Sequence, residues 1–324
     1  MKPIILGLFA AFFFAFTFVL NQAMELSGGS WIWSASLRYI FMIPFLLTLV
    51  LVRRNLRELL MEMKKNPVSW LWWSFVGFGL FYAPLCYATI YSPGWLIAGT
   101  WQITIISGAL LAPLFFETIQ TKNGPLEVRG TIPIKGLMMS SIILLGILLM
   151  QVEHTKSISI ANVVLGVVPV IVASFAYPLG NRKMMQLTQG RIDAYQRVLG
   201  MTLASLPFWL LLSFYGYMTV GLPTKEQSLQ ALLVAVSSGV IATVLFFKAT
   251  DLVRGDMQKL ASVEATQSME VLFALLGEII FLSIAVPSPL SWLGIIIVIA
   301  GMTLHSFAAH KTADLINNKK LAPK

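Results

Sequence analysis

Long apolar runs separated by short polar stretches make up most of the chain. Each run is continuous over 18 to 26 residues and lacks the alternation of about ten residues that is typical of a membrane β-strand. A helix needs about 20 apolar residues to cross a bilayer. The pattern therefore predicts an all-α integral membrane protein with ten transmembrane helices, at residues 3–22, 31–52, 68–90, 95–116, 134–151, 160–180, 195–217, 228–249, 260–285 and 290–309.

The composition agrees with a bilayer as the solvent. Hydrophobic residues make up 57% of the 324 residues and charged residues 11%, whereas soluble proteins average about 45–50% and 25%. The first run follows Lys2 as a signal peptide would, but it is too long and ends at a poor cleavage site, which favours a retained helix. The single cysteine, Cys86, excludes an intramolecular disulfide and a cysteine-based metal cluster.

Basic residues are distributed unevenly between the two sides of the predicted bundle. With ten spans, 20 of the 23 Lys and Arg residues lie on the side that carries both termini. The opposite side has only Lys156 and Lys225, with Arg38 about two turns inside the second span. Because Lys and Arg stay in the cytoplasm during insertion, both termini, including a tail at 311–324, are predicted to be cytoplasmic in the plasma membrane. The net charge of +9 is then an orientation signal, which disfavours a nucleic-acid partner.

The two halves of the chain, 1–155 and 156–310, resemble each other and predict two five-helix repeats. Arg38 matches Arg197 at an offset of 159. Because five is odd, two such repeats must have opposite orientations in the membrane, which is the inverted-repeat architecture of secondary transporters. Seven further residues recur at an offset of 161: Ala88, Thr89, Gly94, Ser107, Leu111, Leu114 and Glu117 match Ala249, Thr250, Gly255, Ser268, Leu272, Leu275 and Glu278.

These features resemble the drug/metabolite transporter (DMT) superfamily, in particular ten-helix EamA-like exporters and their multidrug resistance efflux branch. The resemblance covers essentially the whole chain. It includes Asn21 after the opening helix and the string from Glu270 to Gly277, with Val271 at the place of the family's proline. It implies alternating access, export of small organic molecules, and a cavity lined mainly by helices one, three, four, six, eight and nine.

Three glutamates in the ninth run are the main candidates for chemistry. Ionisable groups are costly inside a bilayer, so their positions indicate function by default. We expect Glu270, near the midplane, to bind substrate and a proton, with Glu264 at the cytoplasmic entrance in the same two roles and Gln267 one turn from both. Alternatively, Glu264 and Glu278 lie at the interfaces and pair with basic residues such as Lys259 or Lys248.

Aromatic and neutral polar residues complete the predicted substrate site. Tyr82, Tyr87, Trp101 and Tyr177 would present aromatic faces to flat or cationic molecules, with Asn21 as a hydrogen-bonding group. The alternative is that these residues form interfacial belts and helix contacts. Arg38 either holds an anionic substrate group or reaches the lipid headgroups.

Motifs narrow the function class. The chain has no Walker P-loop, aspartyl-phosphorylation domain or long cytoplasmic loop, which excludes ATP-driven pumping by this chain. It has no HExxH, GxSxG or paired-aspartate motif, so we expect neither an enzyme nor a metal or cofactor site. The sequence favours a proton-coupled secondary exporter of drug-like or cationic molecules. An amino-acid or other metabolite exporter is the main alternative, a channel or membrane scaffold is less favoured, and a homodimer is compatible with the sequence.

Overall fold

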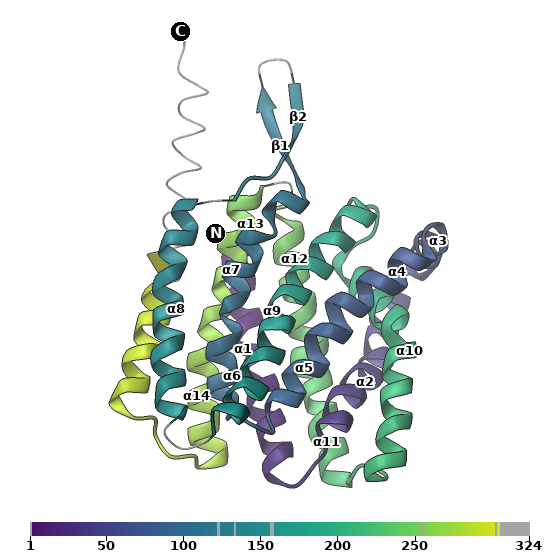
Figure 1. Cartoon of the computed structure of the whole chain (residues 1–324). Helices are drawn as coiled ribbons and strands as arrows, with labels where there is room; N and C mark the ends of the chain where they lie inside the picture. Colours follow the sequence, from purple (N-terminus) through teal and green to yellow (C-terminus); the bar gives the residue numbers. More distant parts are fainter. Residues whose placement is uncertain are drawn as a thin grey trace.

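Helices run side by side between two ends of the molecule and form a bundle (Figure 1). The computed structural model describes residues 2–121, 124–132, 134–155, 159–254, 256–301 and 303–304. In this part of the chain seven helices are long and apolar enough to cross a membrane: Lys2–Leu26, Trp31–Val52, Pro67–Ala88, Ile160–Thr188, Ala194–Val220, Lys225–Asp251 and Ser262–Leu282. Three shorter apolar helices accompany them, Gly94–Leu110, Ser141–Val152 and Pro289–Gly301. This is a multi-pass membrane protein, and the count of ten crossings stays a prediction.

The elements follow the predicted runs closely at most boundaries. The uninterrupted helices are α1 (Lys2–Leu26), α2 (Trp31–Val52), α8 (Ile134–Thr155), α9 (Ile160–Thr188) and α10 (Ala194–Val220). The others are divided: α4 (Pro67–Ser74), η1 (Phe75–Gly79) and α5 (Leu80–Ala88); α6 (Gly94–Trp101) and α7 (Ile103–Leu110); α11 (Lys225–Val234), η3 (Ala235–Ala242) and α12 (Thr243–Asp251); α13 (Met257–Ala265), η4 (Thr266–Ser268) and α14 (Met269–Leu282). Residue 302, residues 305–309 of the last predicted span and the tail at 311–324 lie outside the described residues.

A two-stranded hairpin between α7 and α8 was not predicted. After a short 3₁₀ turn, η2 (Ala112–Leu114), strand β1 (Phe116–Thr121) pairs antiparallel with β2 (Gly124–Arg129). The predicted fourth span, which ended at 116, is therefore too long, since α7 ends at Leu110. Asn123-Gly124 is a sequence signal for a two-residue turn, but the pairing of Thr121 with Gly124 places Gly124 in β2 and not in the turn.

Two π-helical segments, η1 and η3, interrupt the third helix of each predicted repeat. A shift of 161 residues places η1 inside η3. Gly77 in η1 lies against Gly180 of α9 so closely that a Cβ on Gly180 would lie within 3 Å of the Gly77 backbone. Small residues allow such close approach of membrane helices.

Helices from the two halves interleave. Helix α2 packs along α10, α5 along α9, and α1 along both α14 and η3. Helix α8 lies beside the helix Pro289–Gly301 (Figure 1), where Gly146 meets the carbonyl of Gly294. The bundle core thus contains helices contributed by both halves.

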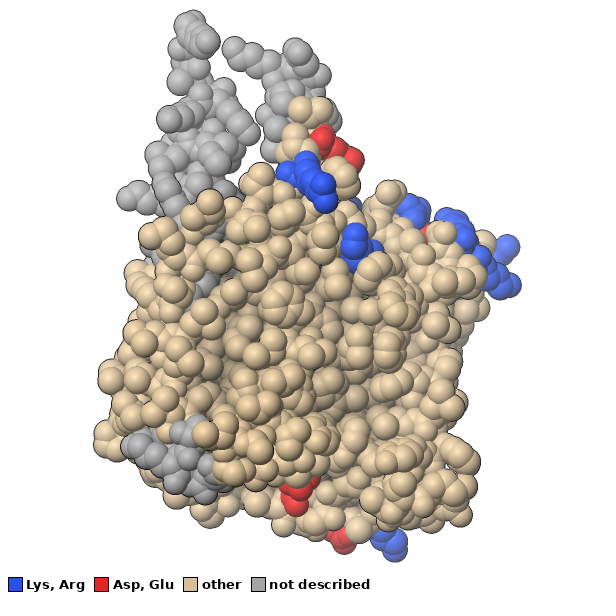
Figure 2. All heavy atoms as spheres, viewed as in Figure 1, with Lys and Arg blue, Asp and Glu red and all other residues tan. Residues whose placement is uncertain are grey.

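On the face of the molecule shown in Figure 2, the exposed charged residues lie at the two ends of the bundle. Lys and Arg gather over the end that carries the hairpin and the short helix α3 (Leu56–Lys65), and the flank in this view is uncharged. The apolar flank matches a bilayer environment. The basic end is the one predicted to face the cytoplasm, and that orientation stays a prediction.

Candidate functional site

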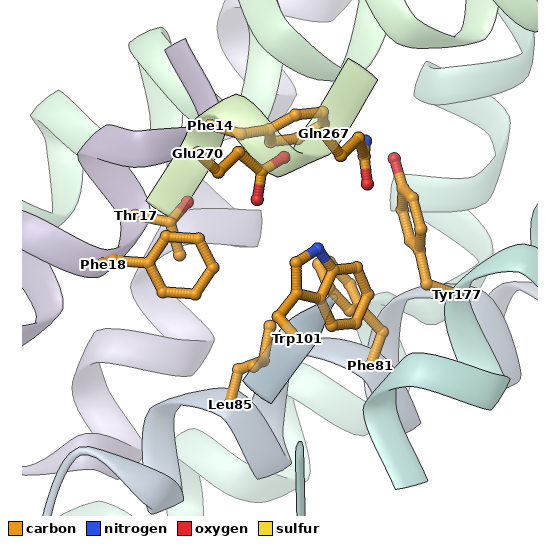
Figure 3. A pocket seen from close by; sticks show the side chains of 9 residues that line it. All are labelled: Phe14, Thr17, Phe18, Phe81, Leu85, Trp101, Tyr177, Gln267 and Glu270. Carbon is orange, nitrogen blue, oxygen red and sulfur yellow. The ribbon is translucent and has the colours of Figure 1, made fainter. Parts of the chain in front are cut away.

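A small cavity lies in the middle of the bundle, next to the break in the ninth predicted helix. The 3₁₀ segment η4 separates α13 from α14. Gln267 in η4 and Glu270 at the start of α14 point from this break into the cavity, which contains about 250 Å³ of space not filled by atoms (Figure 3). The lining residues come from α1, α5, α6, α9 and the η4–α14 segment: Phe14, Thr17, Phe18, Phe81, Leu85, Trp101, Tyr177, Gln267 and Glu270.

Glu270 is the one charged residue among the described residues that line the cavity. Its side chain is 2% exposed, and no described residue forms a hydrogen bond with Oε1. Figure 3 shows its carboxylate directed into the space between Thr17, Trp101 and Gln267. An uncompensated carboxylate in a protein interior is costly unless it gains a proton or a cationic partner. The cavity therefore presents one buried carboxyl group that can bind a proton or a cationic group.

Aromatic rings make up much of the remaining wall. The ring centroid of Tyr177 is 4.5 Å from that of Phe81 and 5.8 Å from that of Trp101. The Tyr177 hydroxyl is buried and has no hydrogen-bond partner in the part of the chain that the structure describes. Aromatic faces beside a carboxylate are suited to organic cations.

Two other predicted site residues lie one layer behind this wall. The Tyr82 ring packs on Phe81 at 5.9 Å and does not line the cavity. Its hydroxyl donates to Oδ1 of Asn21 over 3.2 Å, and the Asn21 amide donates to the sulfur of Cys86 over 3.4 Å. In this conformation both residues contact neighbouring helices.

Tyr87 lies outside the cavity lining. Its ring packs edge-on against Trp31 at 5.4 Å, and its hydroxyl is 3.1 Å from that of Tyr91. These contacts are between helices near the end of the bundle that carries few basic residues.

Glu264 forms a buried ion pair with Arg182. Arg182 donates through Nη2 and Nε to the two carboxylate oxygens over 2.7 and 3.1 Å, and through Nη1 to the carbonyl of Gly108 over 2.7 Å. The partner is thus neither Lys259, which pairs with Asp256, nor Lys248. Sequence reasoning missed Arg182 because the sixth apolar run stops at Gly180, whereas α9 continues to Thr188 and carries the arginine inside the bundle.

The two residues whose surroundings the sequence left open are both buried in protein. Arg38 is 1% exposed, and Glu278 is 0% exposed against the first residues of α6. Neither reaches the headgroups in this structure.

Three lining residues on α1 were also missed: Phe14, Thr17 and Phe18. Their three- and four-residue spacing places them on one face of the helix. This spacing carries no signal in a helix that is apolar on every side, although Thr17, bonded to Ser238 of η3, is one of the few polar residues there.

A larger groove of about 1,400 Å³ lies on another face of α1, between α11, η3 and α14. None of the described residues in its lining is charged, and Leu233, Ile280 and Phe281 among them are more than half exposed. Such a surface suits lipid acyl chains, so the smaller polar cavity is the better candidate for a specific site.

Comparison with known proteins agrees with these features. Residues 1–311 match the family model described as "EmrE: Putative multidrug resistance efflux transporter". The chain is 59% identical over 309 residues to "Uncharacterized protein YjlA" of Bacillus subtilis (strain 168), covering 95% of both chains. It is 52% identical over 270 residues to an "Uncharacterized 42.1 kDa protein in intracellular alkaline protease 3'region" of Shouchella clausii, covering 83% of this chain and 70% of that protein.

A solved structure titled "Crystal structure of protein" has the same fold. Its TM-score is 0.67 at 11% identity, and the match covers 96% of this chain and 98% of the other. The family match extends over nearly the whole chain, and the fold and the buried polar cavity agree with it. The chain belongs to the EmrE-like multidrug resistance efflux transporter family of the DMT superfamily.

Proposed function

We propose that this protein is a proton-coupled secondary transporter that exports small organic molecules with a cationic group across the plasma membrane. The observation that carries the proposal is Glu270, a buried carboxylate with an unpartnered oxygen in an aromatic cavity at the centre of the bundle. The family assignment supports transport, and the cavity supplies the binding chemistry.

Glu270 provides a simple basis for coupling. A carboxylate in a poorly solvated site binds either a proton or a cationic group, and one occupant excludes the other. Exchange of a substrate cation for a proton then drives export when the outside is more acidic. Trp101, Tyr177 and Gln267 hold the organic part of the substrate in this proposal.

Alternating access requires that the cavity open to one side at a time. In the described conformation the lining residues Trp101, Gln267 and Glu270 are each 2% exposed. The space in the cavity that a water-sized sphere can occupy is about 10 Å³, far below the roughly 300–1,000 Å³ typical of small-molecule sites, so the cavity must widen to take a substrate. This closed form corresponds to an occluded state in the proposed cycle.

Contacts at both ends of the bundle hold this closed form. At the basic end Arg191 binds Glu62 over 2.6 Å, and Arg53 binds Asp193 over 2.9 Å. At the other end the Gln227 amide donates to the carbonyl of Ser30 over 2.7 Å. Each set links the first half of the chain to the second. We propose that transport breaks the two sets in turn.

The contacts also support an inverted repeat. Helix α1 packs against η3 and α12, and α9 packs against η1 and α5. The first helix of each predicted repeat therefore packs against the third helix of the other, as a two-fold relation between the repeats requires. The matching positions of η1 and η3 agree with this arrangement, and π-helical segments occur frequently at functional sites.

The test is flux into proteoliposomes under an imposed pH gradient, with a panel of organic cations. We expect saturable transport that depends on the gradient and is lost in Glu270→Gln. Glu226→Gln, the same substitution at an exposed residue, is the matched control and should transport like the wild type.

Gradient-driven transport that Glu270→Gln leaves unchanged would refute the role of this carboxylate. Flux that does not saturate would indicate a channel, and no flux of any solute would indicate a scaffold.

A further inference from the structure

Glu278 on α14 is a buried carboxyl group that the proposed transport cycle does not use. Its side chain is 0% exposed, and neither carboxylate oxygen forms a hydrogen bond with a described residue. It has no ion-pair partner in the described part of the chain. It lines neither the central cavity nor the apolar groove beside α1. Glu278 is therefore a second buried acid, outside the proposed substrate site.

Three helices close around this carboxyl group, since α14 packs against both α1 and α6. A Cβ on Gly94, the first residue of α6, would overlap Oε1 of Glu278 and lie 2.6 Å from the carbonyl oxygen of Phe18 on α1. On the neighbouring residue of α14, a Cβ on Gly277 would lie 2.7 Å from Cγ2 of Val19. Glycine at both positions allows this close packing. Water therefore reaches Glu278 when these helices separate.

The described surroundings of Glu278 offer no positive charge to balance a carboxylate. Helix α6, η4 and the last apolar helix contain no titratable residue, and those of α1 are Lys2 and Glu25, near its two ends. Glu270, the other acid of α14, is about 12 Å away along the axis. The backbone N–H of Trp95 in α6 interacts with the carboxylate, but outside hydrogen-bond geometry. An unpaired carboxylate is strongly disfavoured in such a place, whereas a protonated carboxyl group carries no charge.

We propose that Glu278 is a second proton-binding site, which takes up a proton each time the bundle closes around it. The site lies four residues before the end of α14 at Leu282, at the end of the bundle away from the hairpin (Figure 1). When α6 and α14 separate there, Glu278 meets water and ionises, because a solvent-exposed glutamate titrates near about pH 4.3. Closure then requires one proton from the solution on that side.

The two glutamates have different roles in this proposal. Glu270 faces the cavity, where a substrate cation competes with its proton. Glu278 is open to one side of the membrane, so its proton returns to that side when the helices separate again, and it adds no driving force. Acid on that side favours the closed form, whichever substrate is bound. This inference rests on the proposed alternating access and adds a site that controls one of its steps.

Uptake of a single proton fixes the size of the effect. At a pH well above that at which exposed Glu278 titrates, the ratio of closed to open form falls about tenfold for each pH unit. Substrate exchange at saturating substrate includes the closing step, so its turnover, kcat, should fall by up to about tenfold per unit as the pH rises. The KM reports competition at Glu270 and should change separately, rising in acid.

The experiment measures exchange of 1-methyl-4-phenylpyridinium, a cation whose charge does not change with pH, by the purified full chain in proteoliposomes. The pH is equal on both sides and is varied from about 6 to 8, where an exposed glutamate is ionised. For wild type we expect kcat to fall with rising pH. In Glu278→Gln the kcat should no longer depend on pH, while the pH dependence of KM remains. Glu226→Gln, at an exposed residue, is the matched control and should keep both dependences.

Infrared spectroscopy of the purified chain tests proton binding without any substrate. At pH 7 the wild type should show the C=O stretching band of protonated carboxyl groups. Glu278→Gln should remove part of this band, and the same part should remain in Glu270→Gln. Glu226→Gln should leave the band unchanged, because an exposed glutamate is ionised at this pH.

The outcomes separate this inference from the proposed export function. Wild-type pH dependence of kcat in Glu278→Gln, with or without a loss of stability, overturns the inference and leaves export intact, as does an unchanged carboxyl band. If 1-methyl-4-phenylpyridinium is not exchanged, the infrared comparison alone decides whether Glu278 holds a proton. If Glu278→Gln does not fold, Glu278→Asp replaces it, and the band should then shift in frequency; an unshifted band overturns the inference.

Discussion

The buried pair Arg182–Glu264 allows a quantitative test of the structure. Glu264→Gln keeps the shape of the side chain and one acceptor oxygen but removes the charge that faces Arg182. The two side chains are 3% and 7% exposed, and two hydrogen bonds of 2.7 and 3.1 Å join them. Removing one partner of such a pair leaves the other charge buried and typically costs about 3–5 kcal/mol. We expect Glu264→Gln to lower the free energy of unfolding by an amount near the lower end of that range, because the Gly108 carbonyl still accepts a hydrogen bond from Arg182.

A double-mutant cycle isolates this interaction. Unfolding is followed by tryptophan fluorescence during SDS titration and during heating, for Glu264→Gln, Arg182→Met and the double variant. The double variant should lose less stability than the two single variants lose together, because it leaves neither charge of the pair buried without its partner. Asp256→Asn is the matched control. Asp256 pairs with Lys259 over 3.0 Å, and the two side chains are 37% and 54% exposed. Asp256→Asn should therefore lower the free energy of unfolding by no more than about 1 kcal/mol.

Two results would contradict the reasoning. Additive losses in the cycle would show that the two residues do not interact in the folded protein. A Glu264→Gln variant that keeps wild-type stability but loses transport would instead support the sequence-based prediction that Glu264 lines the substrate entrance.

Two further predictions concern other contacts. The hydrogen bonds from Arg191 lower the pKa of Glu62. This pair should therefore stabilise the protein by about 1 kcal/mol at neutral pH, and the contribution should disappear as the pH falls through the lowered pKa. The Tm difference between wild type and Glu62→Gln should be present at pH 7 and vanish once the pH lies below the lowered pKa, and a difference that stays the same as the pH is lowered would contradict this. Gly180→Ala should destabilise the protein by about 1–3 kcal/mol, because the added Cβ would meet the backbone of η1. At an exposed helix position the same change would stabilise a protein by up to about 1 kcal/mol. A lower Tm in thermal unfolding would therefore confirm the close contact, and a higher Tm would contradict it.

How far the site was predictable depends on how unusual each residue is in its sequence context. Glu270 and Gln267 are polar residues within an apolar run, and both line the cavity. Trp101 and Tyr177 line it as well, although nothing in the sequence distinguishes them from Tyr87, which packs against Trp31. Aromatic residues are common throughout this chain, so their type alone says little about which face they occupy.

Pairing between charges was not predictable from spacing. Glu264 and Arg182 are 82 positions apart, and they meet because α9 extends beyond its apolar run. The same limit applies to Arg38 and Arg197. They match in sequence, yet only the packing of α10 beside α12 shows that one has a carboxylate partner.

The sequence by itself determined the solvent, the helical class and most helix boundaries, because the cost of placing polar groups in hydrocarbon leaves a strong local signal in every apolar run. It also identified the family, since the resemblance extends along the chain. Only the tertiary structure decided which polar groups meet, which remain unpaired and which aromatic rings surround them. Those properties arise from contacts between helices far apart in the chain, and in helices that are apolar on nearly every side the hydrophobic pattern does not specify which face turns inward.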